Sequence, residues 1–234
     1  MINLKMNLIL FKLRFFLIIF KSRILKKKLN LKYKDLKKNF ENYLIEKEFT
    51  EKWFLNNFEI FNFFLPEDLD KKFSYLEIGS FEGLSALNVL FNFKNCKVTT
   101  IDLWKKSNIN SESLNVNFDD VEKKFNNNLK DYEYNKIKKD SVIAMRELLS
   151  KKIFFDVIYI DGSHNGEDII SYAIEGYKLL NKNGIMIFDD IVNENENISI
   201  QSHKGFEKFC ELYNKKIKLL YLKNIAVVKK LNEF

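Results

Sequence analysis

The nine residues YLEIGSFEG, at positions 75–83, carry the clearest structural signal in this chain. An apolar run ends at Gly79, and Gly83 follows four residues later. This pattern predicts a buried strand, a tight turn and then a helix, because glycine permits the turn and lets the backbone approach a ligand closely. Only 7 of the 234 residues are glycine, so the position of each one is informative. We therefore expect a ligand at the carboxyl end of this strand, where ligands bind in open α/β sheets.

Strand and helix patterns alternate from residue 74 to the end of the sequence. Strands are predicted at SYLEIG, KVTTID, YNKIKKD, FFDVIYID, GIMIFDD, KIKLLYLK and NIAVVKKL. Helices are predicted at 82–93, 118–130, 141–149, 167–180 and 204–213. Repeated strand–helix units imply a doubly wound α/β fold, with a mostly parallel sheet and helices on both faces. The last two strands, which almost nothing separates, are predicted to form a closing antiparallel pair.

The first 70 residues precede this alternation and form two further segments. Residues 1–30 are an apolar and basic arm, and residues 31–70 are predicted to be a helical cap over the sheet, ending near Pro66. We assign residues 31–234 to a single domain whose core is 74–230.

The positive charge of the chain is concentrated near its N-terminus. Residues 1–38 contain twelve Lys or Arg and a single acid, a net +11, so the net +7 of the whole chain leaves −4 for the rest. An acidic body argues against a nucleic-acid partner. The longest uncharged run of the arm, Phe15 to Phe20, is too short to span a bilayer, and no cleavage site follows it. We expect a cytoplasmic protein.

The basic arm, residues 1–30, leaves two main alternatives open. In the first, it is a helix on an anionic membrane surface, with Lys26–Lys28 near the headgroups and the protein at the inner face of the membrane. In the second, it packs on the body or on a second subunit of a homo-oligomer. A transmembrane anchor is a third, less favoured alternative.

The glycine turn at 77–83 differs from the turn that binds dinucleotides. It reads E-x-G-x-x-x-G rather than G-x-G-x-x-G, with Glu77 at the strand end and Glu82 at the helix start. Two carboxylates would repel a pyrophosphate and suit a ligand that bears an ammonium and a sulfonium. Asp102, at the end of the next strand, can accept hydrogen bonds from a ribose diol. The alternative is a glycine turn required only for helix–strand packing.

Acids also end two later strands. Asp161 follows one of them, and Asp189 and Asp190 follow another. Three converging carboxylates are hard oxygen ligands that suit Mg²⁺. The alternative is that one or two of them cap the following helices. His164 stands three residues after Asp161, where it is either a general base or a structural histidine.

Three stretches, YLEIGSFEGLSAL, VTTIDLW and FDVIYIDGSHNGEDIISYAIEGYKLLNKNGIMIFDDI, resemble the class I methyltransferases. The resemblance covers residues 74–230 and is greatest to the metal-dependent branch with the macrolide-sugar and catechol-type O-methyltransferases. It implies a Rossmann-like seven-stranded sheet whose last strand is antiparallel, and S-adenosylmethionine as the cofactor. Glu77 and Gly79 would line its methionine end, Asp102 its ribose, and Asp140 and Ser141 its adenine. The other cofactor-binding residues that the resemblance implies are Ser80, Phe81, Gly83, Ser85, Leu103 and Asp161.

The same resemblance implies the catalytic chemistry. Similarly placed acids bind a divalent cation in this branch, which assigns Asp161, Asp189 and Asp190 to Mg²⁺ or a similar ion. The macrolide-sugar enzymes carry a histidine at the place of His164, where it is thought to be the base, so Asp161 and His164 are the expected catalytic residues. We expect O-methylation of a small acceptor with adjacent hydroxyls, a sugar first and a catechol-like or polyketide molecule second.

Two functions from other classes compete with this expectation. One is a nicotinamide-dependent oxidoreductase on a similar sheet. The other is a non-catalytic, methyltransferase-like subunit of a glycan assembly system, anchored by the basic arm. Acceptor specificity is expected to lie in the cap at 31–70, in a polar lid at 103–117 and in an insertion at 191–204.

Overall fold

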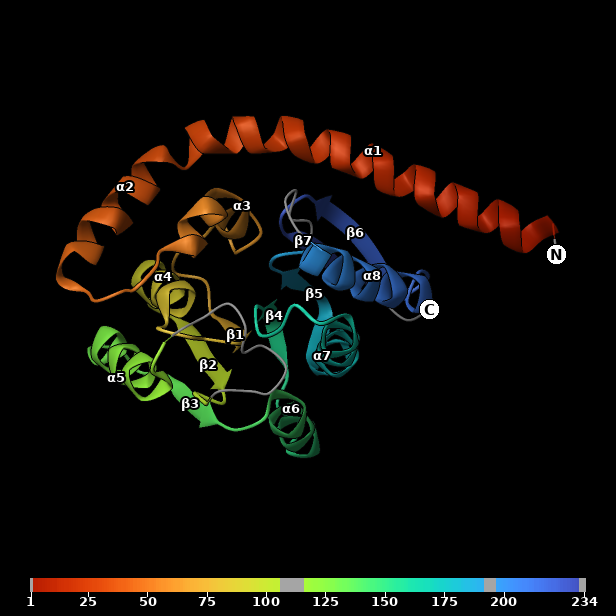
Figure 1. Ribbon diagram of the computed structural model, residues 1–234. Helices are drawn as coiled ribbons and strands as arrows, with labels where there is room; N and C mark the ends of the chain where they lie inside the picture. The colour runs from red at the N-terminus through yellow and green to blue at the C-terminus, as the bar shows by residue number, and fades with distance from the viewer. Residues whose placement is uncertain (1, 106–115, 192–196, 232–234) are drawn as a thin grey trace.

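The computed structural model describes residues 2–105, 116–191 and 197–231, with the side chains of 2–14, 16 and 197–201 left aside. One sheet lies at the centre of the molecule, with helices around it (Figure 1). Its strands are β1 (Phe73–Ile78), β2 (Cys96–Asp102), β3 (Asn135–Lys138), β4 (Phe155–Ile160), β5 (Leu180–Phe188), β6 (Ile217–Leu222) and β7 (Ala226–Lys230). The α-helices are α1 (Ile2–Lys32), α2 (Lys34–Tyr43), α3 (Phe58–Phe63), α4 (Leu84–Asn92), α5 (Phe118–Leu129), α6 (Ser141–Ser150), α7 (Gly166–Leu179) and α8 (Asn197–Leu212).

The sheet has seven strands in the order β3-β2-β1-β4-β5-β7-β6. The first five strands of this order pair in parallel, while β7 runs antiparallel to both β5 and β6. The predicted fold class is confirmed: a doubly wound, mostly parallel sheet whose last strand is antiparallel. The order reverses beside β1 and β4, which is where ligands bind in such sheets.

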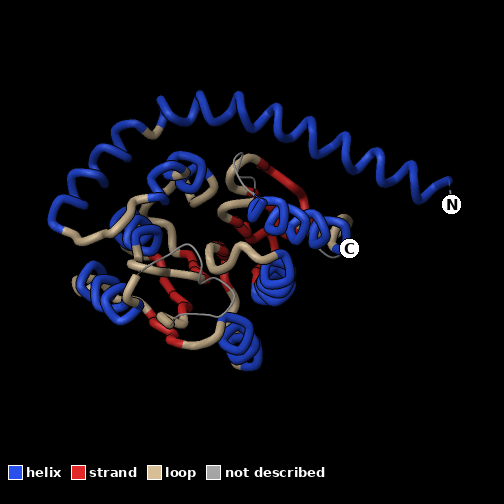
Figure 2. Tube along the Cα trace, in the orientation of Figure 1, coloured by secondary structure: helices blue, strands red, loops and turns tan. Residues whose placement is uncertain are grey.

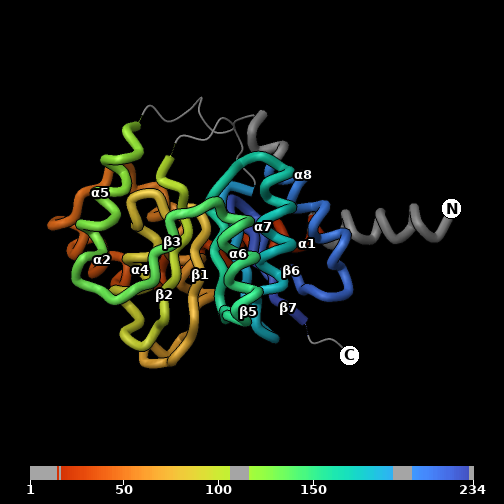
Figure 3. The backbone as a smooth tube through the Cα atoms, turned by 90° about the horizontal axis from the view of Figure 1, so that it is seen from below, coloured from red at the N-terminus to blue at the C-terminus, as the bar shows by residue number. Residues whose placement is uncertain are grey.

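Helices cover both faces of the sheet, as Figure 2 shows by colour. Alternate strand residues point to opposite faces, so Tyr75 belongs to one buried cluster and Leu76 to the other. The first cluster includes side chains of α2, α3, α4 and α5, and the second includes side chains of α6, α7 and α8. The view from below shows α6 and α7 in front of the strands (Figure 3).

The predicted helical cap is present. It consists of α2, α3 and two short 3-10 helices, η1 (Leu44–Glu46) and η2 (Trp53–Asn56). Phe40, Phe54 and Phe61 of the cap are buried in the first cluster. The cap therefore covers the same face of the sheet as α4, and its side chains reach the strand ends where the candidate site lies.

Helix α1 continues past the expected end of the arm, to Lys32. From Phe15 onward it packs on the body: the backbone N–H of Leu222 on β6 donates to Ser22 Oγ over 3.0 Å, and the ring of Phe15 lies 6.4 Å from that of Phe206. The alternative in which the arm packs on the body is therefore observed for this part of the helix. No helix among the described residues is both long and apolar enough to cross a membrane.

Two segments with expected roles in acceptor specificity fall partly outside the described residues. Residues 106–115 belong to the predicted lid, and residues 192–196 belong to the predicted insertion. The described part of the site is formed by the strand ends, the cap and helices α4, α6 and α7.

Candidate functional site

The turn between β1 and α4 requires glycine at both predicted positions. Gly79 and Gly83 each have a φ of +84°, which side-chain-bearing residues rarely adopt. A Cβ added at Gly79 would lie 2.3 Å from the carbonyl oxygen of Asp161, and one at Gly83 would lie 2.6 Å from Leu129 Cδ1. Close packing therefore explains part of the need for glycine at these two positions, as the alternative of a turn required only for packing predicted. The close approach at Gly79 also brings the ends of β1 and β4 together.

Glu77 is fully buried at the end of β1. The hydroxyl of Tyr75 donates to its Oε2 over 2.6 Å. Among the described residues, Glu77 Oε1 and the nearby buried Ser80 Oγ make no hydrogen bond of regular geometry, although the hydroxyls of Ser85 and Ser80 lie close enough to lower the pKa of Glu77. Burial raises the pKa of Glu77 to about 7, against the lowering effect of the Tyr75 hydroxyl. A cationic hydrogen-bond donor placed here would satisfy the free oxygen and restore the charge.

Glu82 pairs with residues of the cap and of α5. Its carboxylate accepts hydrogen bonds of 2.6 Å from both the N–H and the hydroxyl of Thr50, and Lys124 Nζ lies 3.0 Å away. The cap and α5 thus give both oxygens of Glu82 a partner, which explains this buried carboxylate without a ligand, and its expected part in binding a cationic ligand stays a prediction. Glu82 joins the cap to the glycine turn.

Asp102 ends β2 and organises the neighbouring backbone. Its two oxygens accept the N–H groups of Phe81, over 2.9 Å, and of Trp104, over 2.7 Å. Burial raises the pKa of Asp102, and these backbone donors oppose that rise. Both Phe81 and Trp104 have positive φ, and the Trp104 indole N–H donates to the carbonyl of Phe81 over 2.8 Å. Each carboxylate oxygen keeps a second lone pair, which a ribose hydroxyl could use.

The remaining predicted cofactor residues lie around these strand ends. Ser85 is buried in the first turn of α4, and Leu103 follows Asp102 and is exposed. Asp140 is the N-cap of α6, since its Oδ1 accepts the N–H of Ile143 over 3.0 Å, and Ser141 is the first residue of that helix. The capping bond explains Asp140 without a ligand. The adenine-binding role of Asp140 and Ser141 stays a prediction.

A second group of side chains gathers at the ends of β4 and β5. Asp161, His164 and Asp190 each place one possible ligand atom within 4.8 Å of the other two. His164 Nε2 lies 3.3 Å from Asp190 Oδ2, and their side chains are 50% and 45% exposed. Burial and then the charges of Asp189, Asp190 and Glu77 raise the pKa of Asp161 well above its usual range. The cluster can hold a cation, and a cation would relieve this repulsion.

Asp189 lies behind this cluster rather than in it. Its Oδ1 accepts hydrogen bonds of 2.9 Å from Asn57 Nδ2 and from the N–H of Asp190, and the Tyr159 hydroxyl donates to its Oδ2. That hydroxyl also lies 3.5 Å from Asp161 Oδ2. Burial raises the pKa of Asp189 to about 6. The structure therefore brings His164 together with two of the three predicted metal ligands, and the metal role of Asp189 stays a prediction.

Sequence reasoning missed three residues of the site: Tyr75, Tyr159 and Asn57. The two tyrosines had a readable signal. Each stands two residues before a strand-end acid, in YLE and in YID, which places the pair on one face of the strand. The two motifs are also adjacent in register, because Glu77 pairs with Tyr159 across β1 and β4. Asn57 had no such signal, since only the folded cap brings it to Asp189.

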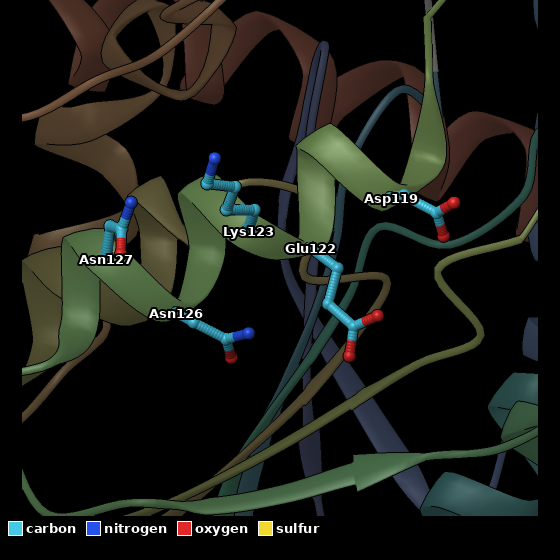
Figure 4. A pocket seen from close by; sticks show the side chains of 5 residues that line it. All are labelled: Asp119, Glu122, Lys123, Asn126 and Asn127. Atoms are coloured by element: carbon cyan, nitrogen blue, oxygen red, sulfur yellow. The ribbon is translucent and has the colours of Figure 1, made fainter.

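A shallow pocket of about 300 Å³ lies elsewhere, on α5 (Figure 4). Its lining residues are Asp119, Glu122, Lys123, Asn126 and Asn127. Lys136 and Lys138 both pair with Glu122, which occupies the carboxylate. None of the predicted site residues lines this pocket, so it does not bear on the chemistry of the strand ends.

Comparison with known proteins gives the same picture of the core. A family model described as a methyltransferase domain matches residues 76–191. An uncharacterized protein, R132 of Acanthamoeba polyphaga mimivirus, is 29% identical over 135 residues, which are 55% of this chain and 54% of that protein. The chain thus spans about half the length of this curated relative.

Two solved structures share the fold. The O-methyltransferase from Bacillus cereus, in complex with SAH, has a TM-score of 0.51 and 18% identity over 68% of this chain and 74% of that chain. The MycE methyltransferase of the mycinamycin biosynthetic pathway, in complex with Mg, SAH and mycinamycin VI, has a TM-score of 0.56 and 16% identity over 85% of this chain and 55% of that chain. At these identities the likeness shows the fold alone.

Proposed function

We propose that this chain, whose residues 76–191 match a methyltransferase-domain family model, transfers a methyl group from S-adenosylmethionine to a hydroxyl oxygen of a small acceptor. The acceptor class is a sugar or another molecule with adjacent hydroxyls. One observation carries this proposal: the free oxygen of buried Glu77 and the cluster of Asp161, His164 and Asp190 belong to the ends of neighbouring strands. A cofactor site and a cation site thus share one edge of the sheet.

The residues at the end of β1 fit S-adenosylmethionine, which supplies an electrophilic methyl group on a sulfonium and also bears an ammonium. Glu77 Oε1 and Ser80 Oγ are buried polar atoms that make no hydrogen bond of regular geometry among the described residues. Burying such groups unpaired is costly, so a ligand ammonium would stabilise them. Asp102 retains acceptor capacity for the ribose hydroxyls. Gly79 keeps the turn free of a side chain.

The residues at the ends of β4 and β5 fit a divalent cation. Asp161 and Asp190 offer hard carboxylate oxygens, which suit Mg²⁺ or Mn²⁺, and His164 lies beside them. A cation held by Asp161 and Asp190 would lower the pKa of an acceptor hydroxyl. Two adjacent hydroxyls would offer it two oxygen donors, which is why a diol is the proposed acceptor. The MycE structure, which shares this fold, contains Mg, SAH and mycinamycin VI.

His164 is the proposed general base. Its imidazole is half-exposed and can reach an acceptor at the edge of the sheet. Asp190, 3.3 Å away, would stabilise the imidazolium that forms when His164 takes the hydroxyl proton. Asp189 does not contact His164 through any described hydrogen bond or ion pair. Its role is to stay fixed by Asn57 and Tyr159 and to add negative charge behind the cluster.

Isothermal titration with S-adenosylhomocysteine, with and without Mg²⁺, tests the proposal. We expect the nucleoside to bind in both conditions and Mg²⁺ to bind with an affinity that Asp161→Asn lowers by at least about tenfold. Tight binding of NADH, with none of S-adenosylhomocysteine, would instead favour an oxidoreductase.

The activity assay uses a set of sugars and catechols as acceptors. Methyl transfer should stop in EDTA and in Asp161→Asn, and full activity in EDTA would overturn the metal step. Intact binding of nucleoside and Mg²⁺, with no transfer to any acceptor, would favour the non-catalytic assembly subunit.

A further inference from the structure

Helix α1 has two apolar sides. The side that faces the body includes Phe15, Ser22 and Leu29, all buried. The opposite side carries Leu17, Phe20 and Ile24, which are 53%, 60% and 47% exposed, and further along Leu31. Their spacings of three, four and seven residues place them on one stripe of the helix. Burial on the body therefore explains only half of the apolar character of this segment.

Basic side chains flank the exposed stripe. Lys21, Arg23, Lys27 and Lys28 are all exposed, and none of them forms an ion pair within the part of the chain that the structure describes. The 31 residues of α1 contain no acid. An apolar stripe between basic side chains is the pattern of a helix that lies in the surface of an anionic membrane.

The stripe cannot turn inward. Lys26, on the inner side, donates through Nζ to the carbonyl of Asn56 over 3.1 Å, and Ser22 holds β6. These contacts fix the rotation of the helix on the body. In Figure 1, α1 arches across the outside of the molecule, beyond the cap and β6. The outer side of α1 therefore lies on the surface of the molecule along the length of the helix.

We propose that the outer side of α1, residues 17–31, docks on an anionic lipid bilayer. The charge distribution supports this partner, because the segment 1–38 carries +11 while the rest of the chain carries −4. A negative surface would attract the helix and repel the body, which orients the protein. The apolar side chains would enter the headgroup region without crossing the membrane.

A second copy of the chain fits the stripe less well. In a helix pair, Lys27 or Lys28 would lie in the seam between Ile24 and Leu31, where equal charges of the two copies would oppose each other. On a membrane the same lysines point to lipid phosphates. The docking proposal does not depend on the proposed reaction, because it uses none of the strand-end residues.

Vesicle co-sedimentation of the full chain tests the docking. The protein should bind vesicles made of equal parts of phosphatidylcholine and phosphatidylglycerol and not bind phosphatidylcholine alone. We expect the double variant Leu17→Ser/Phe20→Ser to weaken binding by about tenfold or more. Lys21→Gln/Lys27→Gln/Lys28→Gln should weaken it on the order of a hundredfold at low salt.

Matched variants on other surfaces serve as controls. Ile153→Ser/Phe154→Ser removes exposed apolar side chains, and Lys97→Gln/Lys151→Gln/Lys182→Gln removes exposed charges, all outside the elements that pack on α1. Both controls should bind vesicles like the parent. Titration with S-adenosylhomocysteine and thermal melting confirm that every variant is folded, since exposed substitutions change stability little.

Two results would overturn the proposal. One is equal binding of the parent and the α1 variants to anionic vesicles. The other is no vesicle binding together with a dimer, measured by sedimentation velocity, that Leu17→Ser/Phe20→Ser dissociates. The second result would assign the stripe to a second copy. Loss of vesicle binding with normal nucleoside binding separates this inference from the proposed function.

Discussion

The two halves of the strand-end site are built on different principles. At β1 and β2, the backbone provides the order: Asp102 fixes two N–H groups and Gly79 admits the neighbouring loop. At β4 and β5, acids lie together: burial and then the charges of Asp189 and Asp190 raise the pKa of Asp161, and burial and the charge of Asp190 raise the pKa of Asp189.

The β1–β2 half is held by neutral donors, because the Tyr75 hydroxyl fixes one oxygen of Glu77 and backbone N–H groups fix Asp102, while the other oxygen of Glu77 stays open to a ligand. The β4–β5 half holds neighbouring acids in place through Tyr159 and Asn57, so a cation bound there would relieve their repulsion. Substitutions in the first half should therefore act through conformation, and those in the second through charge.

The largest effect is expected from Gly79→Ala. The added methyl group would meet the Asp161 carbonyl at 2.3 Å, in a backbone conformation with φ of +84° that alanine disfavours. We expect a loss of more than about 3 kcal/mol in the free energy of unfolding, measured in urea, and loss of nucleoside binding.

Gly176→Ala is the matched control for Gly79→Ala. Gly176 lies within α7, and an added Cβ would be 3.5 Å from Met186 Cε, an ordinary contact. Alanine also favours the helix, so stability should stay equal or rise slightly. Equal tolerance of both substitutions would contradict the description of the β1–β2 half as a fixed turn.

Glu77→Gln should remove about 3 kcal/mol from the change in the free energy of unfolding with pH. Burial raises the pKa of Glu77 from 4.5 to about 7 in the folded state. Between these pH values the unfolded chain loses this proton first, so the folded state loses stability as pH rises toward 7 and no more above it. Urea unfolding at pH 5 and pH 8 measures how steeply the free energy of unfolding falls with pH.

The glutamine variant should show a flatter slope, to which Asp189, with a pKa raised to about 6, still contributes in the same direction. The variant should also bind S-adenosylhomocysteine more weakly than the parent at pH 8. If the free energy of unfolding of the variant depends on pH as steeply as that of the parent, Glu77 is not the buried acid that causes this dependence.

Asn57→Ala tests how the β4–β5 half is held. It removes the side-chain donor that lies 2.9 Å from Asp189 Oδ1 in a buried environment. We expect a loss of about 1–2 kcal/mol in unfolding free energy. Asn95→Ala is the control, because Asn95 makes a similar bond of 2.9 Å, to the carbonyl of Asp70, on the surface. A loss no larger than in the control would mean that Asn57 does not hold Asp189.

His164→Gln should have the smallest effect on stability, within about 0.5 kcal/mol, because its contact with Asp190 is half-exposed. This variant distinguishes a general base from a metal ligand. As a base, His164 should affect methyl transfer, by about a hundredfold or more, while Mg²⁺ affinity measured by titration stays within about threefold. A large fall in Mg²⁺ affinity would assign His164 to the metal as a ligand.

Local patterns were sufficient to predict the fold. Each predicted strand overlaps an observed one, because nearly continuous apolar runs such as FFDVIYID suit strands that are buried on both faces. The glycine turn and the strand-end acids could also be placed, since parallel strands end at the same edge of the sheet.

The functions of individual carboxylates could not be predicted in this way. Glu82 and Asp189 look like ligands in the sequence, yet each is occupied by a partner from the cap, Thr50 or Asn57. These partners are distant in the chain, and no local pattern announces them. The hydrogen-bond partners of a carboxylate come from distant parts of the chain, so the sequence alone overestimates how many acids have oxygens available for a ligand.

The contact between Ser22 and Leu222 joins residues 200 positions apart. On the ribosome, α1 is made long before the strand β6 that covers its inner side. At a synthesis rate of ~5–20 residues per second, this delay is on the order of ten seconds or more. Throughout it, both apolar sides of the helix are open to chaperones and to aggregation. Slow or paused translation between α1 and β6 should therefore lower the yield of soluble protein more than a pause after β6.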